Sequence, residues 1–350
     1  MKHYISILGL VIVFFAVFSC GGPKDAKQAD FDQPEKIECD SIAIEQILAP
    51  ALWTVNGDKV AILSPKTDSL FFVYRAPDFE YLYSFGRAGG GPDDFQYPRF
   101  IPDVSGKGRL LISSLMKVSD MDLTDKSAKV AGKERYEGYL MPNLIVNDSV
   151  VLAQSTTFDD NILRAFYRTA NVKNNNRTID SVQVLINTKG FKIETSGSGM
   201  RASGQIYNSP RLVAKAGKMA LIYPDVRRID IFEISPDGKI NLIKSEGEVL
   251  TLEQIQALDI SERQKGEDVF DAQAGDNYIY VFTYDYENMG TWRKSLNSYM
   301  EVYDWEGNRV KKFDLGRPFT RFLIDEARGK IYCYHSGYDF ENVYIYDYSL

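Results

Sequence analysis

Short runs of apolar residues, many of them alternating with polar residues, occur in pairs along most of the chain. Residues 52–55 and 59–63 flank Asn56-Gly57, and another pair flanks Gly217. Asn-Gly is a strong hairpin signal because a two-residue turn requires positive φ, which glycine adopts at little cost. Turn residues such as Pro236-Asp237-Gly238 separate further pairs of runs. The pattern predicts antiparallel hairpins in an all-β chain.

A three-residue motif precedes these hairpins six times. It is usually a proline or an acid, then a variable residue, then a large apolar residue. The copies begin at Pro50, Pro98, Pro142, Pro210, Asp268 and Thr320, which lie 44 to 68 residues apart. Because this spacing suits one four-stranded unit per copy, we predict a six-bladed β-propeller with four antiparallel strands per blade. The expected blades cover about 51–86, 98–137, 142–187, 210–246, 268–315 and 320–350, the last completed by residues 36–47.

The last copy holds only three strands before Leu350, so its fourth strand must come from elsewhere. Residues 36–47 alternate apolar and polar, and we expect them to supply that strand and close the ring. The alternative is that they form a linker. In the closed ring, Cys39 and Cys333 lie two strands apart, about 9.6 Å. Because the Cα atoms of a disulfide are at most ~7 Å apart, we predict two free thiols.

The N-terminus carries a targeting signal. Residues 4–18 form an apolar run that is short for a membrane span, and Ser19-Cys20-Gly21 follows it. This arrangement resembles a bacterial lipobox, which implies a signal peptide at 1–19 and a lipidated Cys20. The alternative is an ordinary signal peptide with an incidental cysteine. Residues 20–35 are polar and rich in Gly, Pro and charge, and we expect a flexible tether that leads to a propeller at 36–350.

One segment resembles a known repeat. Residues 85–121 carry a Gly-rich turn, then Phe and Pro, then Asp and a second Gly turn. The matching residues are Gly86, Gly89, Gly91, Pro92, Phe95, Pro98, Asp103 and Gly106. The segment resembles an NHL repeat, and the whole chain is similar to TolB-like six-bladed propeller lipoproteins of the Bacteroidetes. The resemblance implies the fold and a place in the cell envelope, at the outer membrane because Gly21 rather than Asp follows the cysteine.

Composition narrows the possible partners. The chain has 48 acidic and 41 basic residues and a formal charge of −7, and no long Lys/Arg cluster occurs. We therefore expect no nucleic-acid partner, and contact with the membrane through the lipid anchor alone.

The long connections predict where a ligand binds. They fall at 86–97, 187–209, 247–267, 284–298 and 335–342. If the four strands of a blade are called A to D from the axis outward, all of these are D-to-A or B-to-C connections, which lie on one face of a propeller. The alternative is simple variation in loop length. Within 247–267, residues 251–264 predict a short helix capped by Thr251.

Three arginines occupy the variable position of the motif in alternate blades. Arg99, Arg211 and Arg321 begin the innermost strands of blades two, four and six, so we expect them around the mouth of the central channel. Guanidinium groups suit carboxylate, sulfate or phosphate. The alternative is local pairing of each arginine with an acid such as Asp93, Asp94, Asp225 or Glu267.

Two further segments offer ligand-binding candidates. Tyr286, Trp292 and Arg293 place aromatic and basic side chains together, as at interface anchors and sugar-stacking platforms. The alternative is that the tyrosines pack between blades. His335, in a B-to-C connection, is the remaining candidate.

The sequence contains no recognisable catalytic constellation. Removal of the signal leaves His335 as the single histidine, no nucleophile-elbow motif accompanies it, and we expect no metal and no cofactor. The sequence favours a non-catalytic, lipid-anchored propeller that binds an envelope protein or an anionic glycan through its loop-rich face. The alternative is a hydrolase or lyase that acts on an anionic or carbohydrate-like substrate at the central channel.

Overall fold

The protein was analysed as a computed structural model. It describes residues 31, 33–44, 46, 50–115, 117–135, 142–159, 162–187, 192–196, 199–203, 209–257, 265–288, 293–337 and 339–350. Among these residues, no helix is both long and apolar enough to cross a membrane.

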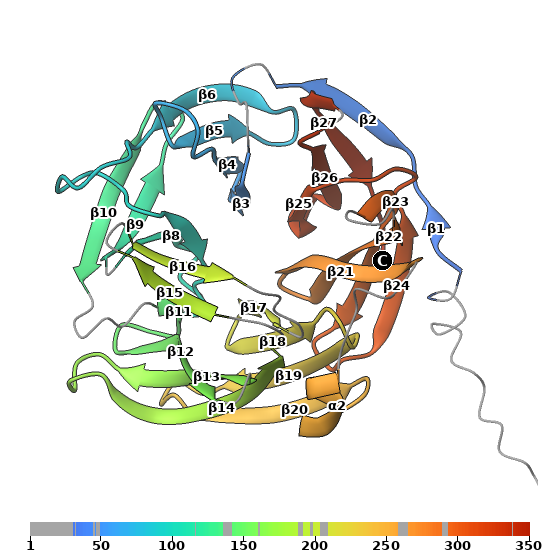
Figure 1. Cartoon of the computed structure of the whole chain (residues 1–350). Coiled ribbons are helices and arrows are strands. Elements are labelled where there is room, and N and C mark those ends of the chain that lie inside the picture. The colour runs from blue at the N-terminus through green and yellow to red at the C-terminus, as the bar shows by residue number, and fades with distance from the viewer. Residues whose placement is uncertain are drawn as a thin grey trace, which may run out of the picture.

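Six antiparallel sheets surround a central axis, which confirms the predicted propeller (Figure 1). Blade 1 contains β3 (Leu52–Asn56), β4 (Lys59–Leu63), β5 (Phe71–Arg75) and β6 (Glu80–Phe85). Blade 2 contains β7 (Arg99–Ile101), β8 (Leu110–Ser114), β9 (Lys117–Leu123) and β10 (Ala128–Arg135). Blade 3 contains β11 (Pro142–Ile145), β12 (Val150–Asp159), β13 (Ile162–Asn171) and β14 (Arg177–Asn187).

The second half of the ring repeats this order. Blade 4 contains β17 (Arg211–Lys215), β18 (Lys218–Tyr223), β19 (Arg228–Ile234) and β20 (Ile240–Glu246). Blade 5 contains β21 (Lys265–Ala274), β22 (Tyr278–Asn288), β23 (Arg293–Asp304) and β24 (Arg309–Asp314). Blade 6 contains β25 (Arg321–Asp325), β26 (Lys330–His335) and β27 (Asp339–Asp347).

The N-terminal segment closes the ring as predicted. Strand β2 (Cys39–Ala43) pairs antiparallel with β27, so that Cys39 lies opposite Tyr346. Cys39 and Cys333 are both free, as expected for thiols two strands apart. Burial raises the pKa of the Cys333 thiol well above its ordinary value.

The same segment also touches blade 5, which the sequence did not predict. Strand β1 (Glu35–Lys36) pairs in parallel with β24 as a fifth strand of that blade. Phe31 is buried, and its ring lies 5.3 Å from that of Tyr303. The chain therefore contacts the propeller at Phe31, before the boundary expected at residue 36.

Apolar clusters fill the interfaces between consecutive blades. Blade 1 packs Trp53 and Tyr74 against Tyr332 of blade 6, and one comparable cluster lies at each of the other five interfaces. Side chains on both faces of a blade are therefore buried, which explains the continuous apolar runs of β4 and β18.

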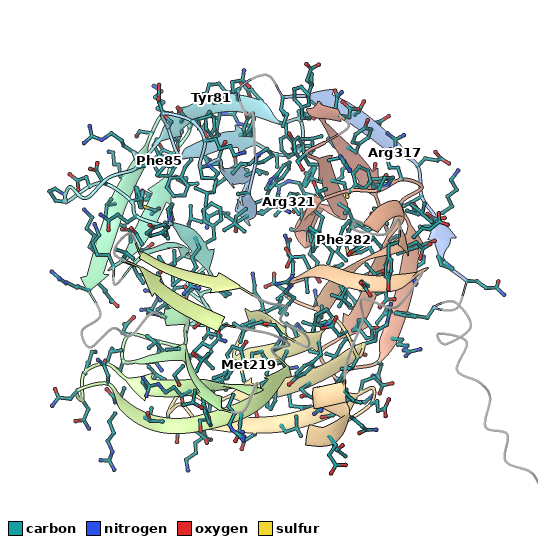
Figure 2. The ribbon with its side chains drawn as sticks, viewed as in Figure 1. Tyr81, Phe85, Met219, Phe282, Arg317 and Arg321 are labelled. Carbon is teal, nitrogen blue, oxygen red and sulfur yellow. The ribbon has the colours of Figure 1, made fainter. Side chains whose placement is uncertain are left out.

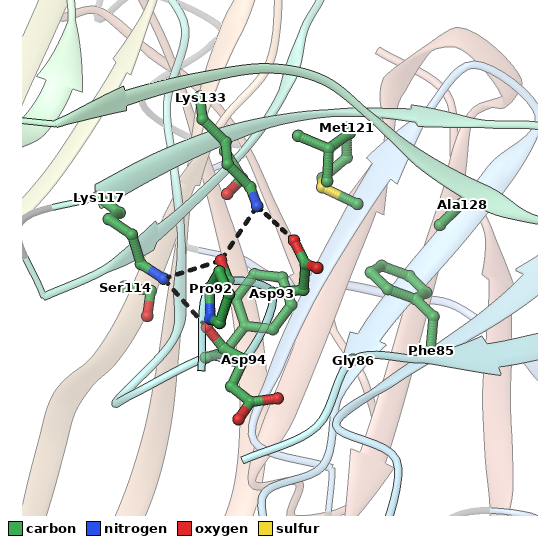
Figure 3. A pocket seen from close by; sticks show the side chains of 13 residues that line it. Phe85, Gly86, Pro92, Asp93, Asp94, Ser114, Lys117, Met121, Ala128 and Lys133 are labelled. Atoms are coloured by element: carbon green, nitrogen blue, oxygen red, sulfur yellow. Dashed lines mark hydrogen bonds and ion pairs between the residues drawn. The ribbon is translucent and has the colours of Figure 1, made fainter. Parts of the chain in front are cut away.

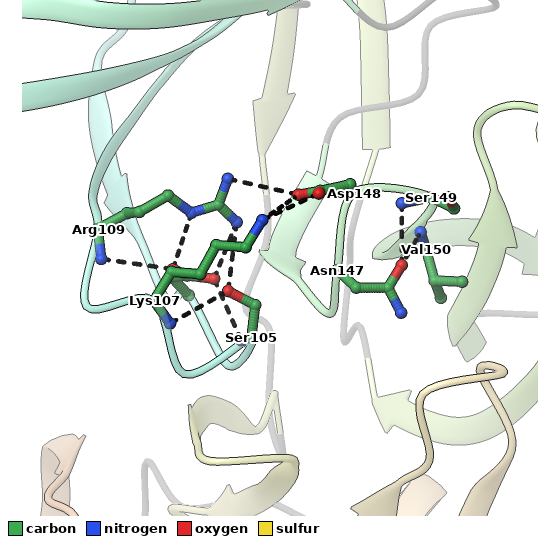
Figure 4. Close-up of polar contacts among 8 residues, drawn as sticks. Ser105, Lys107, Arg109, Asn147, Asp148, Ser149 and Val150 are labelled. Atoms are coloured by element: carbon green, nitrogen blue, oxygen red, sulfur yellow. Dashed lines mark hydrogen bonds and ion pairs between the residues drawn. The ribbon is translucent and has the colours of Figure 1, made fainter.

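A ring of polar contacts joins the blades on the face that carries the A-to-B and C-to-D turns (Figure 4 shows one part). We call it the polar ring. Its links, in blade order, are Asn56 Nδ2 to Gly108 O (3.0 Å), Lys107 Nζ to Asp148 (2.8 Å), Asn147 Nδ2 to Pro236 O (2.8 Å), Lys215 to Asp276 (3.1 Å), Asn277 N to Glu326 (3.0 Å), and Arg328 to Gly57 O (3.1 Å). Each blade is thus tied to the next, and the last is tied to the first.

Candidate functional site

The face opposite the polar ring carries the longest insertions. Strands β12 and β13 pair over their full length, as do β22 and β23, and β14 and β21 follow these two hairpins to their ends. A separate hairpin, β15 (Lys192–Ser196) with β16 (Gly199–Ser203), lies in the connection between blades 3 and 4. Helix α2 (Leu252–Ala257) lies in the connection between blades 4 and 5 and contacts β14 of blade 3. We call this the elaborated face.

Helix α2 confirms part of the predicted helix at 251–264. The Thr251 hydroxyl accepts a hydrogen bond from the Gln254 amide (3.2 Å), and the Gln254 side chain accepts one from the Thr251 amide (2.8 Å). This reciprocal arrangement is a capping box, which satisfies amide groups that the first turn leaves unpaired. Residues 258–264 lie outside the described residues.

The prediction of a long loop at 284–298 is wrong. Strand β22 continues to Asn288, Tyr284 pairs with Ser298, and the Tyr299 hydroxyl donates to the Asp285 carboxylate at 2.8 Å. The Tyr-Asp-Tyr-Glu run alternates aromatic and polar residues, which is a strand pattern. The connection at 187–209, also expected as a loop, contains the hairpin β15–β16.

The aromatic candidates in this region do not form an exposed platform in the described residues. Tyr286 is only 1% exposed, and its ring lies 6.1 Å from that of Tyr284. Tyr286 is therefore a packing residue, which agrees with the alternative for the tyrosines. Trp292 lies outside the described residues. Arg293 is the first residue of β23 and pairs with Asn288.

His335 ends β26 and is half-buried. Its Nδ1 accepts a hydrogen bond from the Gly337 amide at 2.9 Å, and burial lowers its pKa below the ordinary value for histidine. One ring nitrogen is thus engaged in the turn between β26 and β27, a structural task.

The structure separates the three motif arginines. Arg99 is half-buried, and its guanidinium donates a hydrogen bond to the carbonyl oxygen of Pro142 in the next blade at 2.9 Å. Burial lowers its pKa, and its Nε is buried with no acceptor among the described residues. Arg99 therefore links blade 2 to blade 3.

Arg211 and Arg321 begin the inner strands of blades 4 and 6, on either side of blade 5. Arg211 is exposed at the start of β17. Arg321 is half-buried at the start of β25, at the inner edge of blade 6 (Figure 2). Its guanidinium donates to the Thr320 carbonyl oxygen at 2.5 Å and lies 5.9 Å from the ring centre of Phe270 in blade 5.

Asp271 lies on the inner strand of blade 5, between the blades that carry these two cations, and both act on its carboxyl. Burial raises the pKa of its carboxyl, and Arg211 and Arg321 oppose that rise. Its carboxylate accepts a hydrogen bond from the Ala272 amide at 2.9 Å, and it forms no ion pair with any described residue. Arg211 also lies near Tyr167 of blade 3, whose pKa burial raises to about 12 against the effect of Arg211. We call Arg211, Asp271 and Arg321 the axial cluster.

Sequence reasoning missed Asp271 because a bulge hides it. The pairing of β21 with β22 shifts between Val269 and Asp271. A bulge inserts one residue and changes the direction of the side chains that follow it. The motif copy in blade 5, Asp268-Val269-Phe270, ends one residue before Asp271, so the motif assigns no role to this acid.

Two of the acids considered as local partners of the motif arginines pair with other cations. Asp93 pairs with Lys133 at 2.6 Å, and Asp94 pairs with Arg87 at 3.0 Å. Within the described part of the chain, Arg99, Arg211 and Arg321 form no ion pair with a carboxylate. No group of three or more His, Cys, Asp and Glu residues there is arranged to hold a metal ion.

Comparisons with known proteins add no family. No family model matches the chain, and no curated protein matches it by sequence. Among solved structures, it is similar to a luciferin-regenerating enzyme (11% identity, 89% of this chain and 96% of that chain, TM-score 0.40). It is also similar to a gluconolactonase of Xanthomonas campestris (10%, 90% and 94%, TM-score 0.40) and to a protein from Lactobacillus plantarum (9%, 86% and 81%, TM-score 0.38). At this level of similarity no activity transfers, and the six-bladed architecture rests on the strand order of the chain itself.

Proposed function

We propose that the protein is a lipid-anchored propeller of the cell envelope, related to the TolB-like and NHL-type propellers, that binds an anionic group at the axial cluster. One observation carries the proposal: Arg211 and Arg321, from the blades on either side of blade 5, both act on the Asp271 carboxyl, and neither arginine forms an ion pair with a described residue. Two cations that share one carboxylate leave a net positive charge.

The chemistry of the cluster defines the ligand class. A guanidinium group presents a planar fork of donors that matches carboxylate, sulfate and phosphate. Asp271 offsets one of the two positive charges, so a single acidic group fits. The partner that best supplies such groups in an envelope is an anionic glycan, with an acidic loop of an envelope protein as the other source.

Binding of the soluble domain, meaning the chain that begins at residue 31, to three immobilised polysaccharides tests the proposal. Polygalacturonate carries carboxylates, chondroitin sulfate carries sulfates and carboxylates, and dextran is neutral. Retention on either acidic matrix and none on dextran supports the proposal. Equal behaviour on all three contradicts it.

The anchor is tested separately. Cys20→Ala removes the thiol that would carry the lipid, so the variant should move from the membrane fraction to the soluble fraction of the envelope. A variant that stays in the membrane fraction would exclude Cys20 as the anchor.

One observation favours a second candidate, a hydrolase or lyase that uses Asp271. Burial raises the pKa of the Asp271 carboxyl, which is the direction of shift that a general acid requires. Asp271→Asn distinguishes the candidates: an enzyme would lose turnover of an acidic polysaccharide, whereas a binding protein would show no turnover before or after the change.

A further inference from the structure

A cavity lies away from the axial cluster, between the outer parts of blades 1 and 2. Its volume is about 190 Å³, and the connection from Gly86 to Phe95 forms its roof (Figure 3). Strands β8, β9 and β10 supply the opposite wall. The cavity is therefore built by the Gly-rich segment that the sequence singled out and that the axial cluster does not use.

The roof has a fixed shape. The Asp94 carboxylate accepts hydrogen bonds from the Gly91 amide at 2.9 Å and from Arg87 Nε at 3.1 Å. A Cβ atom on Gly91 would lie 2.8 Å from that carboxylate, and one on Gly89 would lie closer still. The loop thus folds tightly around Asp94, and this carboxylate is not available to a ligand.

One side of the cavity is apolar. Figure 3 shows Phe85 and Met121 on one side of the cavity, with the lysines on the other. Phe95 and Met121 are buried, and Val130 at the mouth is 44% exposed. Surface of this kind favours an apolar group, because water gains little from contact with it.

One cation in the cavity has no carboxylate partner. Lys133 pairs with Asp93 at 2.6 Å. Lys117 Nζ contacts only the carbonyl oxygens of Asp94 (3.3 Å) and Pro92 (3.5 Å) among the described residues. The Ser119 hydroxyl also lines the cavity and forms no hydrogen bond with a described residue. An ammonium group beside an apolar cavity is suited to a carboxylate.

We infer that this cavity binds a small apolar group that ends in a carboxylate. The apolar part occupies the space lined by Phe95, Met121 and Val130, and the carboxylate pairs with Lys117 and accepts from Ser119. Two sources share this chemistry: a free organic acid, and the C-terminal residue of a polypeptide with an apolar side chain. The inference stands apart from the proposed function, because none of its residues belongs to the axial cluster.

Calorimetric titration of the soluble domain with 3-phenylpropionate and with 3-phenylpropionamide tests the charge requirement. The two probes have the same shape, and only the acid can pair with Lys117. We expect the acid to bind about tenfold more tightly than the amide, the effect of one charge-assisted contact. Lys117→Met should reduce this ratio to about one.

Two variants control the experiment. Lys129→Met removes the same charge from an exposed position on β10 that does not line the cavity, so it should leave both affinities unchanged. Ala128→Leu fills the cavity and should weaken acid and amide alike. Circular dichroism and thermal melting check that each variant is folded, so that a loss of binding reflects the site.

A second pair of probes separates the two sources. An acetylated tetrapeptide that ends in Phe, with a free or an amidated C-terminus, is titrated in the same way. Binding of the free peptide acid identifies a polypeptide end as a ligand, and binding of 3-phenylpropionate alone identifies a free acid. The inference is overturned if neither acid binds, if acid and amide bind equally, or if Lys117→Met keeps the preference.

Discussion

Arg328, in the A-to-B turn of the last blade, donates a hydrogen bond of 3.1 Å to the carbonyl oxygen of Gly57 in the first blade. The same guanidinium pairs at 2.7 Å with Asp325, whose side chain is 1% exposed. One residue thus closes the polar ring and neutralises a buried acid, while β2 closes the same seam at the outer rim. The two ends of the propeller are therefore joined at two places by different kinds of contact.

Arg328→Met should destabilise the fold. It leaves the Asp325 carboxylate buried without its cation and opens the link to Gly57, so the free energy of unfolding should fall by about 1–3 kcal/mol. Lys330→Met in the same blade is the matched control, because its partner Asp347 is 79% exposed. That control should cost less than about 1 kcal/mol. Equal losses in urea unfolding would mean that Arg328 has no special role.

The N-terminal strands should contribute measurably to stability. A chain that begins at residue 46 lacks β1 and β2 and exposes the edge of β27 and the surface covered by Ile42. Compared with a chain that begins at residue 31, it should lose at least about 2 kcal/mol and aggregate more readily. A chain that begins at residue 38 lacks only β1 and should fall between the two. If the chain that begins at residue 46 is as stable as the chain that begins at residue 31, the closure of the ring by β2 does not stabilise the fold.

Gly86 is required by both its backbone and its surroundings. Its φ is +76°, and a Cβ atom there would lie 2.7 Å from Phe71 Cδ2. Gly86→Ala should therefore destabilise the domain by at least about 1 kcal/mol more than Gly106→Ala, where φ is +78° and the space is open. Thermal melting of the two variants measures the difference. Similar melting temperatures would show that Phe71 moves aside freely.

The Asp271 carboxyl should make stability depend on pH. Its pKa is higher in the folded chain than the ordinary 3.8, because burial disfavours the charged form. The folded state therefore binds the proton more tightly, and this contribution to stability is present below the ordinary pKa and is lost as pH rises through the folded pKa. Asp271→Asn should thus be more stable than the wild type at neutral pH, with a difference that shrinks toward pH 3. A difference that grows as pH falls would show that the arginines dominate over burial.

The sequence predicted the ring because its signals are local. Asn56-Gly57 and the apolar runs beside it report a hairpin whatever surrounds them, and residues 36–47 alternate as an outer strand must. Strand β1 escaped prediction because its two residues carry no pattern, and a parallel pairing with β24 leaves no mark in their order. Packing of Phe31 against Tyr303 is a tertiary contact of the same kind.

The candidate site was less predictable than the fold. Spacing placed Arg99, Arg211 and Arg321 at equivalent positions, but it could not show that Arg99 bonds to Pro142 while the other two approach Asp271. That distinction depends on a bulge in β21, and a single inserted residue has no signature in the sequence. Side-chain partners across blades are fixed by the assembled ring, so they become visible only in three dimensions.

The axial cluster should bind an anionic group. The most direct measurement is the affinity of the soluble domain for polygalacturonate, compared between Arg211→Glu/Arg321→Glu and the control pair Lys129→Glu/Lys239→Glu. Both pairs change the net charge equally, and Lys129 and Lys239 are exposed residues outside the cluster. We predict that the axial pair loses at least about tenfold in affinity while the control pair stays close to wild type. An equal loss of affinity in both pairs would show that binding depends on net charge and not on the axial cluster. Unchanged affinity in the axial pair would contradict the proposal.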